Sequence, residues 1–113
     1  MPRLIALLPL VALAACGRTP DRFAEAKKLI GEQCAACHTV PGVAAAHGNI
    51  GPPLRGIGTR QIIAGKLPNT PENLRRFIQH PQSVEPGGAM PELGLTPQQA
   101  AVIADYLHTL DKP

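Results

Sequence analysis

Five consecutive residues, Cys34-Ala35-Ala36-Cys37-His38, constrain this chain more than any other segment. Cys-x-x-Cys-His is the spacing at which haem is attached covalently to a polypeptide. The two thiols add to the vinyl groups of the macrocycle, and the next residue then lies under the iron, where an imidazole can bind it. The motif therefore predicts one covalent haem, attached through Cys34 and Cys37, with His38 as an iron ligand.

The composition fits a small protein built around such a cofactor. The chain has 113 residues with one Tyr, two Phe and no Trp, but 13 Pro and 11 Gly. A chain of this length forms one domain with a thin core, and a bound apolar macrocycle would supply the centre that its side chains lack. The formal charge of +3 comes without a basic run, so we expect no nucleic-acid partner.

The N-terminus has the features of an export signal. Arg3 precedes an apolar stretch from Leu4 to Leu13, and small residues then lead to Cys16. A helix of this length spans about 15 Å, half the thickness of a bilayer core, so it is too short to cross a membrane. The string LAAC that ends at Cys16 is similar to the processing box of bacterial lipoproteins, where the cysteine receives a lipid.

This processing predicts a simple organisation. A signal peptide at 1–15 is removed, residues 16–22 are the lipidated Cys16 and a short tether, and residues 23–113 form the domain. The alternative is an ordinary signal peptide with an unrelated cysteine. The odd cysteine count favours lipidation, because a third thiol would otherwise remain free in an oxidising compartment. We expect an exported protein, anchored on the periplasmic side of the inner or outer membrane.

The domain begins with a predicted helix that leads into the haem motif. Phe23, Ala26, Ile30 and Cys34 recur at spacings of three and four, which indicates one face of a helix from Asp21 onward. Because Ile30 and Cys34 lie one turn apart, this face and the first thioether should point to the same side.

Capping signals predict two further helices. Thr70 is the expected N-cap of a helix over 70–79, with Pro71 at its first position. Thr96 and Gln99 form a capping box at the start of the last helix. The apolar face of this last helix consists of Val102, Ile103, Tyr106, Leu107 and Leu110.

Long loops are expected elsewhere. Residues 40–58 and 83–95 are rich in Gly and Pro and have no helix or strand period. No strand signal competes, so the predicted fold class is all-α, with three to five helices and long loops wrapped around one covalent haem. Loops of this length are uncommon in compact domains unless a function or a cofactor orders them.

Three segments, taken in order, resemble those of class I monohaem c-type cytochromes. They are the early Cys-x-x-Cys-His, the GPPLRG loop at 51–56, and Met90 in a Gly/Pro-rich loop before the last helix. The resemblance covers roughly 23–110 and implies the cytochrome c fold with one haem c. It also implies that the Pro52 carbonyl orients His38 and that Met90 is the sixth iron ligand.

The same resemblance implies how the helices pack, and it shows one departure. The last helix should cross the first, with Ile103 and Tyr106 near Ala26 and Ile30. Relatives often carry a Trp where this chain has Phe77, which cannot donate a hydrogen bond to a haem propionate. Four arginines remain as candidates for that contact: Arg55, Arg60, Arg75 and Arg76.

Met90 has competitors for the sixth position. Once Met1 is removed with the signal, Met90 is the one remaining methionine, and its Gly and Pro neighbours place it outside any helical stripe. The competing side chains are His47, His80 and His108. His80 is the main alternative, although a histidine at a helix end is usually solvated there.

The favoured function is one-electron transfer through a His/Met-ligated haem, because filled axial positions leave no substrate site and we find no catalytic constellation. Redox proteins would be the partners: a quinol-oxidising complex, a dehydrogenase or a terminal oxidase. We expect no enzyme activity and no small-molecule substrate. The alternative is a haem enzyme or ligand sensor with an open or displaceable sixth position. A zinc site is disfavoured because adjacent Cys37 and His38 meet one ion poorly together with Cys34, and a thioredoxin-like dithiol needs a βαβ context.

Overall fold

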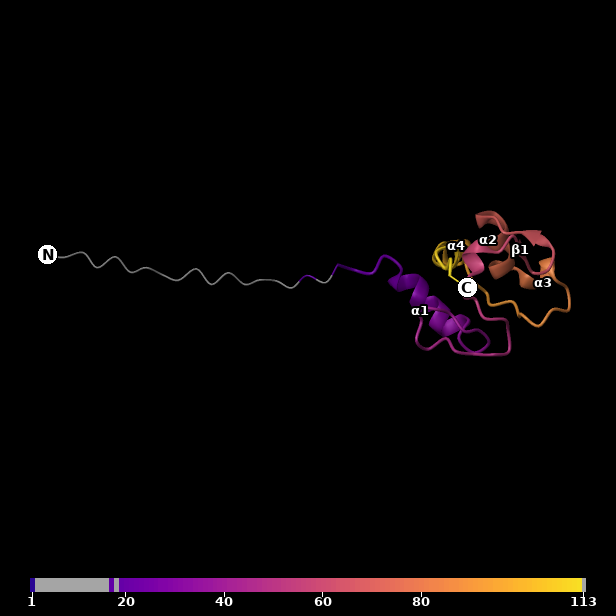
Figure 1. The fold of residues 1–113 in the computed structure, drawn as a ribbon, viewed down its shortest axis with the longest axis horizontal. Helices are drawn as coiled ribbons and strands as arrows, with labels where there is room; N and C mark the ends of the chain where they lie inside the picture. Colours follow the sequence, from indigo (N-terminus) through magenta and orange to yellow (C-terminus); the bar gives the residue numbers. More distant parts are fainter. Residues whose placement is uncertain (2–16, 18, 113) are drawn as a thin grey trace.

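The computed structural model describes residues 1, 17 and 19–112, which form a mostly helical domain (Figure 1). Cys16 and residues 2–15 of the expected signal peptide lie outside the described residues. None of the helices in the described part is long and apolar enough to cross a membrane. The helices are α1 at Ala24–Gln33, α2 at Pro71–Gln79, α3 at Pro81–Val84 and α4 at Pro97–His108, with a 3-10 turn η1 at Ile57–Thr59.

Helix α1 begins three residues later than predicted. The side chain of Asp21 accepts a hydrogen bond from the Phe23 amide (Oδ1 to N, 2.9 Å), so Asp21 forms a turn that precedes the helix. The helix ends at Gln33, and the amide of Cys34 still donates to the Ile30 carbonyl at 2.9 Å. The helix therefore leads directly into the haem motif, as the spacing predicts.

The caps of α2 and α4 confirm the capping signals. Thr70 Oγ1 accepts from the Asn73 amide at 3.2 Å. At α4, Thr96 Oγ1 accepts from the Gln99 amide (3.1 Å), and Gln99 Oε1 accepts from the Thr96 amide (2.9 Å). Pro81 lies just after the end of α2 and begins α3, where a proline at the first helical position loses no hydrogen bond. The prediction of loop over 83–95 is therefore wrong for its first two residues.

The prediction that the domain contains no strand is also wrong. Two-residue strands β1 (Ile62–Ile63) and β2 (Leu67–Pro68) pair antiparallel, with Ile63 opposite Leu67. Gly65 in the connecting turn has φ 68°, a conformation that glycine adopts without strain. Strands this short have no measurable alternation, so the sequence pattern could not reveal them. The hairpin is a small addition to a fold that is otherwise helical.

Helix α4 packs against both α1 and α2 (Figure 1). Ile103 of α4 and Ile30 of α1 are both 0 % exposed, and Ala26 beside them is buried. The rings of Phe23 and Tyr106 meet edge to face, with centroids 5.3 Å apart and planes at 63°. This packing confirms the expected crossing of the first and last helices.

Replacing Thr96 with Ala should test the capping box of α4. The substitution leaves the Gln99 amide without its acceptor, so we expect the free energy of unfolding to fall by about 1 kcal/mol. Urea unfolding of the holoprotein measures the change. Gln98→Ala is the matched control, because Gln98 is exposed in the same turn. Equal stability of the two variants would show that the box contributes nothing.

Candidate haem site

The Cys-x-x-Cys-His segment is wound into a compact turn at the end of α1. The amides of Cys37 and His38 both donate to the Cys34 carbonyl, at 3.1 and 2.9 Å. Cys34 and Cys37 are half-buried and form no disulfide. The turn gathers two thiols and one imidazole in one short stretch, which is the donor set that covalent haem attachment requires.

The ring of His38 is oriented by the carbonyl of Pro52. His38 Nδ1 donates to Pro52 O at 2.8 Å. This bond selects the tautomer in which Nε2 carries the lone pair that can bind iron. The structure thus places Pro52 where the resemblance implies it, and the residues present fit the cofactor.

Glycines allow the following loop to approach the motif closely. A Cβ on Gly51 would lie 2.8 Å from Nδ1 and 3.0 Å from Nε2 of His38, and a Cβ on Gly48 would lie 2.6 Å from the Ala36 carbonyl oxygen. The amide of Gly51 donates to Cys37 O at 2.7 Å, and that of Gly48 to His38 O at 3.1 Å. The loop therefore wraps the motif with backbone rather than with side chains.

Arg60 makes hydrogen bonds to backbone carbonyls of the same loop. Its Nη2 donates to Pro53 O at 2.7 Å and lies 3.4 Å from Arg55 O. These contacts hold the residues that follow Pro52 and so support its carbonyl against His38. A propionate contact by one of the four arginines stays a prediction.

Tyr106 joins the loop that follows the motif to the last helix. Its hydroxyl donates to the carbonyl of Pro41 at 2.5 Å. The neighbouring Gly42 has φ 81°, and a Cβ there would collide with the tyrosine hydroxyl. The helical spacing identified Tyr106 only as part of an apolar face, because a periodic pattern shows which side is buried but not a partner 65 residues away.

Met90 lies half-buried in the loop between α3 and α4. Its backbone carbonyl accepts a hydrogen bond from Gln82 Nε2 at 2.8 Å. The structure brings the other predicted haem ligands and Pro52 together, but the hydrogen bonds of the Met90 loop run to α3. Methionine ligation stays a prediction. Gln82 was missed from the sequence, since no motif distinguishes it from other glutamines.

The three competing histidines lie in other surroundings. His47 is exposed. His80 is exposed at the junction of α2 and α3, with Nδ1 3.5 Å from Glu92 Oε2. His108 Nε2 is 3.1 Å from Asn69 Oδ1. His80 therefore has the solvated helix-end position that the sequence favoured over iron ligation.

The environment of Cys34 is unlike that of a redox-active dithiol. Burial, and to a smaller degree the neighbouring Cys37, raises the pKa of the Cys34 thiol to about 11. Nucleophilic cysteines of dithiol enzymes instead have lowered pKa values, because the thiolate is the reactive form. The Cys34 thiol is protonated at neutral pH and suits a structural attachment point.

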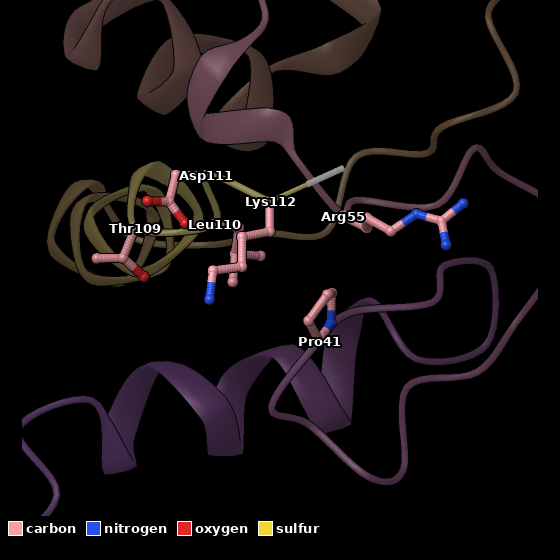
Figure 2. A pocket seen from close by; sticks show the side chains of 6 residues that line it. All are labelled: Pro41, Arg55, Thr109, Leu110, Asp111 and Lys112. Atoms are coloured by element: carbon pink, nitrogen blue, oxygen red, sulfur yellow. The ribbon is translucent and has the colours of Figure 1, made fainter.

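A separate pocket of about 450 Å³ lies at the C-terminal end of α4 (Figure 2). In Figure 2 the side chain of Arg55 extends away from the other lining residues. None of the predicted haem-attachment or iron-ligating residues lines this pocket, although Arg55, one of the four candidates for a propionate contact, does. Its lining consists of Pro41, Arg55, Thr109, Leu110, Asp111 and Lys112.

A helical domain in which a Cys-x-x-Cys-His turn meets a loop that orients the histidine is typical of proteins with covalent haem. Residues 23–111 match the family model "Cytochrome c". The chain belongs to the cytochrome c family and is a class I c-type cytochrome.

Two curated relatives are both named "Cytochrome c oxidase subunit 2". The protein from Alkalihalophilus pseudofirmus is 36% identical over 78 residues, which cover 68% of this chain and 22% of that protein. The protein from Bacillus sp. (strain PS3) is 32% identical over 90 residues, which cover 76% of this chain and 25% of that protein. The chain thus spans about a quarter of the length of these relatives.

A solved structure shows the same fold. The c-type cytochrome SorU from Sinorhizobium meliloti superposes with a TM-score of 0.55 at 23% sequence identity. The match covers 79% of this chain and 90% of that one.

Gly51→Ala should disturb the histidine directly. The added methyl group overlaps the His38 ring, so we expect a loss of about 1–3 kcal/mol in the free energy of unfolding and less haem per polypeptide. Urea unfolding and haem quantification measure both effects.

Gly31→Ala is the matched control for this prediction. A Cβ on Gly31 in α1 meets only Val43 Cγ1 at 3.9 Å, an ordinary contact. Alanine also favours the helix, so stability should stay equal or rise by up to about 1 kcal/mol. If Gly51→Ala behaved like Gly31→Ala, the close approach to His38 would have no consequence.

Proposed function

We propose that this chain is a lipid-anchored, extracytoplasmic carrier of single electrons with one haem c. Cys34 and Cys37 would attach the haem, and His38 and Met90 would bind its iron. The hydrogen bond from His38 Nδ1 to Pro52 O carries the proposal, because it turns a rotatable imidazole into an oriented ligand. When bound, the haem supplies the one-electron step between Fe(II) and Fe(III).

The chain's own residues keep the coordination fixed during that step. The Pro52 carbonyl, braced by Arg60, holds one ligand on a rigid loop. A thioether from Met90 would raise the reduction potential of the iron relative to a second imidazole. With both positions filled, no site is left for a substrate, so we propose that the chain is not an enzyme.

Respiratory redox proteins are the proposed partners. Both curated relatives are named as subunits of cytochrome c oxidase, which supports a terminal oxidase or another respiratory complex as donor or acceptor. Electron-transfer contacts are usually small and transient. A carrier that must release each partner quickly needs no large apolar interface.

The anchor is proposed at Cys16. The LAAC string and the odd cysteine count support lipidation there, and residues 17–21 reach only about 17 Å when fully extended. The domain would therefore stay close to the membrane surface on which it meets its partners. Diffusion in two dimensions would then replace diffusion through the periplasm.

Met90→Ala tests the sixth ligand. The ferric holoprotein should lose the sulfur-to-iron charge-transfer band, and the ferrous variant should bind carbon monoxide at the vacated position. Ala89→Ser changes an exposed neighbour of Met90. This variant should keep the charge-transfer band and should bind carbon monoxide no more readily than the unmodified protein does. Ready carbon monoxide binding by the unmodified protein would instead support a haem enzyme or ligand sensor.

Cys16→Ser tests the anchor. The unmodified protein should sediment with membranes and incorporate labelled fatty acid. The variant should incorporate no labelled fatty acid and should retain its haem, because the haem-attachment residues lie in the domain. An unmodified protein without label, or a variant that took up as much label as the unmodified protein, would refute lipidation at Cys16 while leaving the haem assignment intact.

A further inference from the structure

The carboxamide of Gln82 in α3 holds the loop that carries Met90. Its Nε2 donates to Gly88 O and to Met90 O, both at 2.8 Å. Its Oε1 accepts from the Gly87 amide at 3.1 Å. Both amide hydrogens and the amide oxygen of the Gln82 side chain therefore make hydrogen bonds to this one loop. Two of the bonds are to the glycines before Met90, and the third is to Met90 itself.

The loop returns this contact through Glu92. Its Oε1 accepts from the backbone amide of Gln82 at 3.1 Å, and its Oε2 lies 3.5 Å from His80 Nδ1. The amide of Gln82 lies in the first turn of α3, where it has no partner within the helix. Hydrogen bonds thus join α3 to the loop both before Met90, at the two glycines, and after it, at Glu92.

The loop has few other hydrogen bonds. From Pro86 to Leu95, within the part of the chain that the structure describes, one backbone-to-backbone bond is made, from Gly88 N to Glu85 O at 3.0 Å. Leu95 is buried, and Leu93 packs against the core. These apolar contacts fix the end of the loop near α4, so the stretch that contains Met90 depends on Gln82.

We propose that Gln82 is the positioning residue for the sixth iron ligand, an inference that rests on the proposed ligation by Met90. The carboxamide fixes the backbone from Gly87 to Met90 before the thioether binds. The iron–sulfur bond then need not order a free loop, which would cost conformational entropy for each residue. Glutamate cannot replace Gln82, because a carboxylate has no hydrogen to donate to two carbonyls.

Competition with imidazole on the ferric holoprotein tests this role. Imidazole must displace methionine from the iron, so its apparent dissociation constant reports how firmly Met90 is held. In Gln82→Ala, imidazole should bind at least about tenfold more tightly, because three hydrogen bonds to the loop are lost. Gln82→Glu keeps the size of the side chain and should show the same direction of change if the Ala variant folds poorly.

Ser83→Ala is the matched control. Ser83 is the next residue of α3, and its Oγ donates to His80 O at 3.2 Å without contacting the Met90 loop. The ferric Ser83→Ala holoprotein should bind imidazole with the same affinity as the unmodified protein. Unchanged affinity in both Gln82 variants would overturn the proposal, and so would an equal change in Ser83→Ala, which would assign the effect to helix stability.

Different measurements would refute the ligation by Met90 and the positioning role of Gln82. An unmodified ferric protein without the sulfur-to-iron band would refute ligation by Met90 and, with it, the role of Gln82. A normal band in the unmodified protein, together with unchanged imidazole binding in the Gln82 variants, would refute the positioning role alone.

Discussion

The structure depends on the close contact between the Cys-x-x-Cys-His turn and the backbone of the loop that follows it. The hydrogen bond from His38 to the Pro52 carbonyl needs that backbone within 2.8 Å of the ring nitrogen, which leaves no space for a side chain at Gly51. Proline at the acceptor position limits the motion of the loop, and Arg60 holds it from the other side. The orientation of the His38 imidazole therefore results from steric exclusion as much as from the hydrogen bond itself.

The features predicted from the sequence are those whose physical causes are local. The haem motif and the capping box at Thr96 depend on spacings of a few residues, and the structure has both in their expected places. The predicted apolar face of the last helix is confirmed for Ile103, Tyr106 and Leu107, which are buried. Val102 is not part of the core, and Leu110 packs against the core from beyond the end of α4. The role of Pro52 came from a resemblance, since nothing in a Gly-Pro cluster shows which side chain it faces.

The features that were missed depend on pairings between distant residues. Tyr106 meets Pro41 across 65 positions, and Gln82 meets a loop that has no regular structure. Neither contact leaves a period in the sequence. The strands at Ile62–Ile63 and Leu67–Pro68 were missed because each is only two residues long.

The bond between Tyr106 and Pro41 has a consequence for the order of assembly. The turn from Cys34 to His38 is built from contacts within five residues, so it can form as soon as this part of the chain is synthesised. The next segment, at Pro41, is held by Tyr106, which lies on α4, the last helix to be synthesised. The chain is thus arranged so that the proposed attachment of haem at this turn can precede closure of the fold, because closure requires contacts of much larger sequence separation.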